Sequence, residues 1–336
     1  ISWTDPSGNY WLFGGVGYSE NKPGQLNDLW KYVSMNQQLK LWIVIITLSL
    51  TVGSSFIAIK IVLDSIPPLF AFSIRFMITG GVLILVSCIF ERKSQEINKI
   101  KLWRNALIIG AFLILGGHGL IAYGAQYLSA GIASLLNSTI PLWVVLFMFL
   151  IYRNKITNLT KIGLTLGFSG MVILVGPSIG GDQGLSLVGI ASLLISSLLW
   201  ALGSIFSSKV SLPQNFLLSA GMITLIGGLL LIIPSVLTEE LNLLPSFSDI
   251  NFNLLISYLF LIFIGTVIPL AEFYWLLKVS TAAVANTFAY MAPIVAVFLG
   301  WAILDESVTY LTIIATIVIL IGVALIVRTS ENSNNK

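Results

Sequence analysis

Three ionisable side chains, Arg75, His118 and Glu272, lie inside long apolar stretches of the sequence, where charge is costly unless it has a function. Arg75 could attract an anionic group, or it could be structural and bond backbone carbonyls of a neighbouring helix. His118, in G-G-H-G, could bind a solute or relay a proton, since imidazole titrates near neutral pH, or it could be a neutral packing residue. Glu272 could couple a proton or recognise a cation, or it could pair with another helix.

A second set of side chains, polar or aromatic, could line a path between helices. These candidates are Tyr123, Asn137, Trp200, Trp275, Asn286 and Tyr290. Aromatic residues also form belts at membrane interfaces, so that alternative stays open. The one histidine excludes a multi-histidine metal site, and the acids are too dispersed for a catalytic pair. We therefore expect no enzyme, no metal and no cofactor.

Three prolines, Pro141, Pro269 and Pro293, fall deep inside the apolar stretches. A proline inside a helix removes a backbone hydrogen bond and kinks the helix. In a membrane, such breaks are tolerated where the backbone lines a cavity. We expect these prolines to act as hinges or gates, with the general tolerance of membrane helices for proline as the alternative.

The composition indicates the element that must position these side chains. Hydrophobic residues make up 57% of the chain and charged residues only 9%, and the mean hydropathy is +0.96. Soluble domains carry about 25% charged residues, so this surface must face lipid. The net charge of +3 is small and gives no support for nucleic-acid binding, and the single cysteine, Cys88, excludes a disulfide framework.

Ten stretches are long and apolar enough to cross a bilayer, which takes about 20 residues. They run approximately over 41–61, 67–90, 103–127, 130–152, 158–176, 187–208, 215–237, 252–277, 280–303 and 308–327. If the first stretch starts in the cytoplasm, almost all Lys and Arg of the connecting segments fall on that side and only Lys60 falls outside. This predicts an all-α protein with both termini in the cytoplasm.

The segment before the first apolar stretch is different in character. The strings N-Y-W-L-F-G-G and L-N-D-L-W-K-Y within it resemble the strand pair of a kelch propeller blade. One blade cannot bury its faces alone. We interpret residues 1–34 as a kelch-like fragment or fusion remnant, with Met35 starting the functional unit; the alternative is the last blade of a longer propeller.

An internal duplication divides the rest. Residues 129–141 (S-A-G-I-A-S-L-L-N-S-T-I-P) parallel residues 281–293 (T-A-A-V-A-N-T-F-A-Y-M-A-P), and Gly170 parallels Gly322 at the same offset. We predict one five-helix repeat over 35–178, a second over 179–328, and a polar tail over 329–336. Because five is odd, the second repeat starts on the opposite side of the membrane. Such inverted repeats are typical of carriers that work by alternating access.

These motifs, with A-I-K closing the first helix and P-P-L-F-A-F-S-I-R-F in the second, resemble the EamA-type members of the drug/metabolite transporter superfamily over residues 40–328. The resemblance implies a ten-helix carrier of the inner membrane that exports amino acids, metabolites or toxic compounds.

We therefore expect a secondary transporter for a small molecule, embedded in a lipid bilayer as a monomer or homodimer. The absence of a G-x-x-x-x-G-K-[ST] motif excludes ATP hydrolysis within the chain, so transport is passive or coupled to a proton or counter-substrate. The alternative is a membrane-anchored interaction protein that uses the kelch-like segment.

Overall fold

The computed structural model describes residues 2–4, 10–19, 22–32, 35–90, 99–153, 157–179, 186–207, 210–213, 215–245, 251–279 and 288–334. The chain divides into two compact units, Ile1–Thr47 and Leu48–Lys336. The domain boundaries predicted from the repeat stay predictions.

The N-terminal unit contains a three-stranded antiparallel sheet in the order β1-β2-β3. Its strands are β1 (Ser2–Thr4), β2 (Tyr10–Ser19) and β3 (Lys22–Tyr32). Tyr10 pairs with Tyr32, and the register shifts between Phe13 and Gly15. Both kelch-like strings thus lie largely in paired strands, although the relation to kelch blades itself stays a prediction.

In the part of the chain that the structure describes, the remaining elements are helices, and they form ten consecutive segments. They are α1 (Met35–Leu63); α2 (Pro68–Phe90); α3 (Lys99–Gly110), η1 (Ala111–His118) and α4 (Gly119–Ala125); α5 (Ala130–Asn137) and α6 (Ile140–Tyr152); α7 (Asn158–Ile179); α8 (Leu187–Ser207); α9 (Phe216–Leu237), followed by the short 3₁₀ helix η2 (Glu240–Leu243); α10 (Phe252–Ile262), η4 (Phe263–Val267) and α11 (Ile268–Val279); α13 (Phe288–Leu304); and α14 (Tyr310–Asn334).

Within the described residues, seven of these segments are long and apolar enough to cross a membrane, and three shorter apolar stretches lie in α7, α13 and α14. A helix satisfies its own backbone hydrogen bonds, which hydrocarbon cannot do, so helices are the form that these sequences take in lipid. The predicted all-α membrane fold of ten helices is confirmed.

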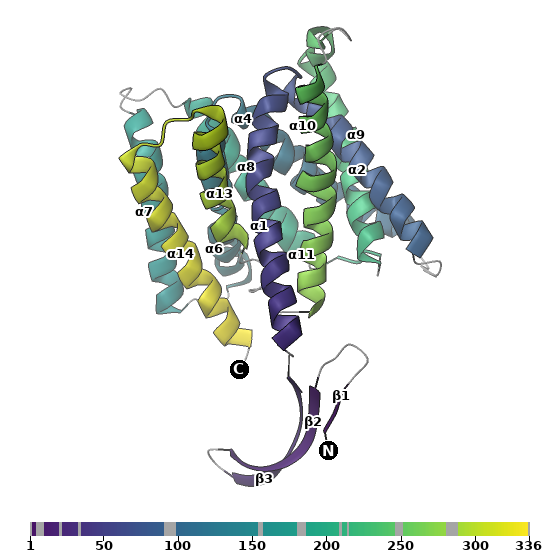
Figure 1. Ribbon diagram of the computed structural model, residues 1–336, viewed down its shortest axis with the longest axis vertical. Coiled ribbons are helices and arrows are strands. Elements are labelled where there is room, and N and C mark those ends of the chain that lie inside the picture. The colour runs from purple at the N-terminus through teal and green to yellow at the C-terminus, as the bar shows by residue number, and fades with distance from the viewer. Residues whose placement is uncertain are drawn as a thin grey trace. The chain divides into compact units, whose positions relative to one another are not determined.

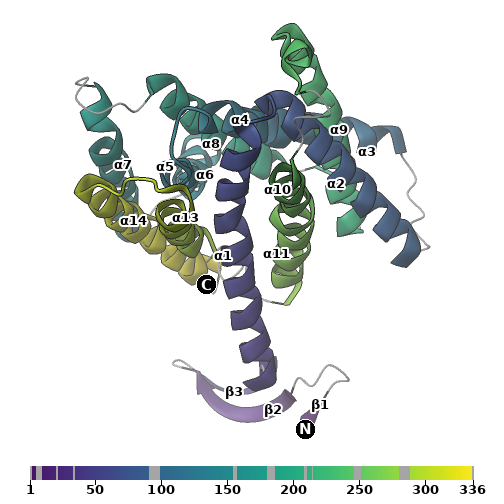
Figure 2. The same cartoon turned by 45° about the horizontal axis from the view of Figure 1, so that its top comes forward.

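Helices of the first repeat pack against their counterparts in the second. Helix α2 lies beside α9, and α7 lies beside α14, in both views of the molecule (Figures 1 and 2). Helix α5 likewise contacts α13. Counterparts that pair with each other are expected where a twofold axis passes between the two repeats.

The contact between α7 and α14 shows this twofold relation residue by residue. A Cβ atom on Gly170 would lie 2.7 Å from Cγ1 of Ile319, and one on Gly322 would lie 2.5 Å from the backbone nitrogen of Gly167. In the sequence, Ile319 follows Gly167 at the same offset by which Gly322 follows Gly170. The two contacts therefore exchange under the repeat, and glycine lets both backbones approach closely.

The starts of α7 and α14 are built in the same way. The hydroxyls of Thr157 and Thr160 lie 2.9 Å apart, and so do those of Thr309 and Thr312, their counterparts in the second repeat. In each pair the first hydroxyl accepts a hydrogen bond from the second threonine's backbone N–H. The residues that follow the preceding helices, Arg153 and Asp305, are also counterparts at the repeat offset, and their φ values of 53° and 52° are both left-handed.

Acidic side chains tie the repeats together at one end of the bundle. The Glu240 carboxylate accepts hydrogen bonds from the backbone N–H groups of Leu69 (3.2 Å) and Phe70 (2.8 Å) at the start of α2. Glu306 accepts hydrogen bonds from the backbone N–H groups of Ala130 (2.6 Å) and Gly131 (3.4 Å) at the start of α5. Carboxylates favour helix N-termini because the unpaired N–H groups and the helix dipole are positive there. Both contacts place each pair on one side of the membrane, as the ten-helix order requires.

Lys60 binds the opposite kind of helix end, the C-terminal end of α4. Its Nζ donates to the carbonyls of Ala125, Gln126 and Leu128 at 3.2–3.4 Å. A cation at a helix C-terminus satisfies carbonyls that have no intrahelical donor.

The fourth segment differs from the continuous helix that we predicted. Helix α5 ends at Asn137 and α6 begins at Ile140, so Pro141 stands in the first turn of a new helix and not deep inside one. In the first turn the missing N–H of proline has no helical partner to lose, which is why the break falls there. The predicted ninth helix began at 280; α13 begins at Phe288, and residues 280–287 lie outside the described part.

Candidate functional site

The third and eighth segments each contain a stretch of π-helix at equivalent positions. The first, η1, starts at Ala111, and the second, η4, starts at Phe263, its counterpart at the repeat offset. Stretches of π-helix are rare and often mark functional sites, because the extra residue frees backbone groups and re-aims side chains. The repeat thus provides two related irregular segments in the interior.

Arg75 of α2 binds the second π segment. Its side chain is only 3% exposed. Nε and Nη2 donate to the Thr266 hydroxyl at 2.9 and 2.7 Å, and Nη2 also donates to the carbonyl of Gly265 at 3.1 Å. The Thr266 hydroxyl in turn donates to the carbonyl of Leu261 at 2.8 Å. The guanidinium is therefore held by neutral oxygens of one neighbouring helix.

Pro269 removes one possible backbone donor to the same carbonyl. In an α-helix, the carbonyl of Gly265 would accept a hydrogen bond from the N–H of residue 269. Proline has no N–H. Arg75 supplies a donor to this carbonyl from outside the helix.

Aromatic rings surround the guanidinium and connect it to His118. The Arg75 guanidinium carbon lies 5.0 Å from the ring centroid of Phe72 and 5.1 Å from that of Phe76, within the range of cation–π contacts. Phe76 packs against His118 with centroids 4.7 Å apart, and His118 meets Trp200 edge to face at 4.9 Å. We call Arg75, Phe72, Phe76, His118 and Trp200 the arginine–aromatic cluster.

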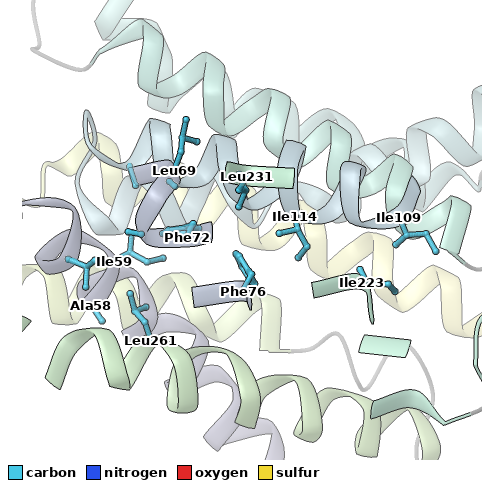
Figure 3. Packing of buried hydrophobic residues seen from close by; sticks show 14 of the residues in the cluster. Ala58, Ile59, Leu69, Phe72, Phe76, Ile109, Ile114, Ile223, Leu231 and Leu261 are labelled. Carbon is cyan, nitrogen blue, oxygen red and sulfur yellow. The ribbon is translucent and has the colours of Figure 1, made fainter. Parts of the chain in front are cut away.

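The cluster sits in the apolar core of the larger unit. Phe72 and Phe76 are fully buried and belong to a core group that also contains Ile114 of η1 and Leu261 of α10. Figure 3 shows Phe76 between these two residues. His118 and Trp200, in contrast, are only half-buried, so this edge of the cluster is the less enclosed one.

Glycines next to His118 let the neighbouring helices approach. A Cβ atom on Gly117 would lie 2.9 Å from the Trp200 ring, and one on Gly119 would lie 2.7 Å from Leu231 of α9. Glycine at these two positions therefore leaves room for side chains of α8 and α9.

The structure brings Arg75, His118 and Trp200 together. Two other candidates, Tyr123 and Trp275, are more exposed than these three. Tyr123 is 36% exposed and meets Tyr127 edge to face, and Trp275 is 37% exposed. Their roles as cavity liners stay predictions.

The other candidates are spread over three helices. Asn137, half-buried, ends α5 just before the break at Pro141. Glu272, also half-buried, lies in α11 three residues after Pro269. Pro293 lies inside α13. Tyr290 belongs to α13, but its side chain and the whole of Asn286 lie outside the described part.

Sequence reasoning missed the partners of Arg75. Phe72 and Phe76 are part of the motif P-P-L-F-A-F-S-I-R-F, and their places three before and one after the arginine could have suggested ring contacts. Gly265 could have been found as the residue four before Pro269. Thr266 offered no signal, because its role depends on the packing of α2 against η4.

The model of the EamA-like transporter family matches residues 39–176 and 187–328 of the chain. The chain belongs to this family. The two matches correspond to the two repeats, and together they include the arginine–aromatic cluster.

Similar EamA-type chains are known from bacteria and archaea. The chain is 29% identical over 291 residues to the uncharacterized inner membrane transporter YedA of Escherichia coli K12, covering 86% of this chain and 91% of that protein. It is 25% identical to the uncharacterized transporter YoaV of Bacillus subtilis, covering 85% and 96%. An uncharacterized transporter of Archaeoglobus fulgidus is 26% identical, covering 86% and 99%.

A solved crystal structure shares the EamA fold of this chain. Its TM-score is 0.56 at 18% sequence identity, and the match covers 85% of this chain and 96% of the other. The family match and the apolar helices together make the chain a multi-pass membrane protein of a transporter family.

Proposed function

We propose that the chain is a secondary transporter that moves a small organic solute across the inner membrane by alternating access, in the direction of export. The observation that carries this proposal is the reciprocal contact of Gly170 with Ile319 and of Gly322 with Gly167. Two inverted repeats related in this way can each take up the conformation of the other. One arrangement then opens to the inside of the membrane and the other opens to the outside.

The π segments supply a site where a solute could bind. Binding sites of inverted-repeat carriers lie near the midplane, where irregular helices leave backbone and side-chain groups available. His118 ends η1, and its half-buried ring next to Trp200 offers a polar group in otherwise apolar surroundings. We assign the solute contact to these two residues.

Glu272 is our candidate for proton coupling. It lies in the eighth segment beyond the second π stretch, in the half of that helix nearer the cytoplasm in the predicted orientation. A carboxyl group in a membrane-spanning helix can carry a proton through one conformational change and release it after the other. Pro141, Pro269 and Pro293 would serve as the hinges, and both termini would lie in the cytoplasm.

Counterflow in proteoliposomes tests the function. The full chain is reconstituted with one unlabelled solute inside, and uptake of the same labelled solute from outside is measured for amino acids, organic acids and cationic drugs. We expect trans-stimulated uptake of at least one solute, independent of ATP. No trans-stimulation by any solute class, from protein that remains folded, contradicts alternating access.

Coupling is tested separately with Glu272→Gln. We expect this variant to keep counterflow but to lose stimulation by a pH gradient. Glu239→Gln is the matched control, because Glu239 is an exposed carboxylate outside the helices. Unchanged gradient dependence in Glu272→Gln would remove Glu272 from the mechanism and leave the transport function standing.

A further inference from the structure

We propose that the transported solute is a small organic anion with an apolar body, whose carboxylate binds at His118 in the positive field of Arg75. This inference rests on the proposed transport function and names its substrate class.

The charge of Arg75 is not balanced by the groups that hold it. They are neutral: a hydroxyl, a carbonyl and two phenyl rings. No carboxylate of the described residues bonds it, and its Nη1 is buried without a hydrogen-bond partner there. A cation enclosed by neutral groups in an apolar interior favours the approach of an anion.

Among the described residues, neither acid near the two helices concerned bonds the Arg75 guanidinium. Glu240 is committed to the backbone N–H groups that start α2. Glu272 lies six residues beyond Thr266, roughly 9 Å along the helix. It is not among the groups to which the Arg75 guanidinium donates.

His118 provides the accessible side of the cluster. Its side chain is half-buried, and its ring nitrogens are not among the buried polar atoms that lack a partner. A neutral imidazole always has one N–H donor, which a carboxylate oxygen can accept. His118 can therefore donate a hydrogen bond to a carboxylate that enters from the accessible side.

Arg75 and His118 are close enough for the charge of one to act at the other. The Arg75 guanidinium carbon lies 5.1 Å from the centroid of Phe76, and the His118 centroid lies 4.7 Å from it. An apolar ring therefore separates the two groups, which lie within about 10 Å of each other. At an effective dielectric constant of about 20, a charge at this distance changes affinity on the order of ten-fold.

The aromatic members of the cluster indicate the body of the solute. Trp200 meets His118 edge to face, and Phe76 covers the ring of His118. A solute bound at the imidazole therefore lies next to aromatic carbon, which favours an alkyl or aryl group adjoining the carboxylate. An amine in the same place would meet the Arg75 charge with the wrong sign.

Binding of matched probes to the full chain in detergent tests the inference. The probes are phenylacetate and hexanoate, each compared with its amide and with the corresponding primary amine, by calorimetric titration. We expect each acid to bind about ten-fold more tightly than its amide, and the amines to bind least. Amines binding as tightly as the acids, or no acid binding at millimolar concentration, overturns the inference.

Variants locate the effect. Arg75→Gln should abolish the preference for acid over amide, whereas Arg75→Lys and Thr266→Val, which keep the positive charge, should retain it. If Arg75→Gln does not fold, Thr266→Val and Arg75→Lys still decide, because loss of the preference in both charged variants contradicts a field effect. His118→Ala should weaken the acids more than the amines.

Counterflow of the same probes separates this inference from the transport function. Counterflow of the amines or amides without the acids keeps the transport function and overturns the anion assignment. Acid binding without counterflow of any probe keeps the anion site and contradicts transport.

Discussion

Arg75 donates a hydrogen bond from Nη2 to the carbonyl of Gly265, at 3.1 Å, across the contact between α2 and η4. Gly265 lies four residues before Pro269, which has no N–H to give to this carbonyl. One side chain of the second helical segment thus donates a hydrogen bond to the backbone of the eighth. The same side chain reaches His118 through the ring of Phe76.

This relationship predicts a thermodynamic coupling between Arg75 and Pro269. Arg75→Gln removes this donor, and in the wild-type background residue 269 has no N–H to replace it. In a Pro269→Ala background the new N–H at residue 269 can replace it. We expect Arg75→Gln to cost about 1 kcal/mol less in that background, as measured by a double-mutant cycle of unfolding in detergent. Additive effects would show that the two residues act independently.

The Thr266 hydroxyl should stabilise the folded chain chiefly through the hydrogen bonds that it accepts from Arg75. Thr266→Val removes the acceptor of two guanidinium hydrogen bonds, and we expect a loss of about 1–3 kcal/mol in the free energy of unfolding. Thr266→Ser keeps the hydroxyl and is the control. Equal stability of the two variants would mean that the bonds contribute nothing.

Alanine at glycines of the repeat contact should destabilise the chain. A Cβ atom on Gly322 would meet the backbone of α7 at 2.5 Å, so that a helix must move, and we expect Gly322→Ala to cost about 1–3 kcal/mol. Gly81→Ala is the matched control, because a Cβ atom there meets nothing within 4 Å. That variant should be neutral or stabilised by up to about 1 kcal/mol, as alanine favours helix. Thermal unfolding in detergent separates the two outcomes.

The carboxylate at the start of α2 should stabilise the chain in a way that an exposed neighbour does not. Glu240 is 6% exposed and accepts two backbone hydrogen bonds and one from Ser235. We expect Glu240→Ala to lower the free energy of unfolding by about 1–2 kcal/mol. Glu239→Ala, at the exposed residue beside it, should change it by less than about 0.5 kcal/mol. Equal effects in a denaturant titration would show that the cap adds no stability.

The sequence was sufficient to predict the membrane fold, but it was not sufficient to predict the irregular segments within the helices. The ten apolar stretches are found as helices because about 20 apolar residues in lipid have few alternatives to a helix. The repeat offset, seen in Gly170 and Gly322, also describes the threonine pairs and the π segments. Neither the π segments nor the break before Pro141 could be predicted, since apolar composition is the same on both sides of each.

The site was predictable only in part, and for a physical reason. Arg75 and His118 could be found because ionisable side chains are rare inside apolar stretches. A single sequence is enough to see this. Their contact through Phe76 depends on how α2 packs against η1 and η4. Tyr123 and Trp275 show the limit of residue type as a signal, because aromatic side chains serve surfaces as well as interiors.

The inverted relation of the two halves, on which the proposed transport depends, is tested most directly at Arg153 and Asp305. Both are exposed, and both follow helices at equivalent positions of the repeats. In a Cys88→Ala background, Arg153→Cys and Asp305→Cys are labelled in intact cells with a membrane-impermeant maleimide, and again after permeabilisation. Inverted repeats predict that Asp305→Cys reacts in intact cells and Arg153→Cys only after permeabilisation. Labelling of both positions from the same side would contradict them.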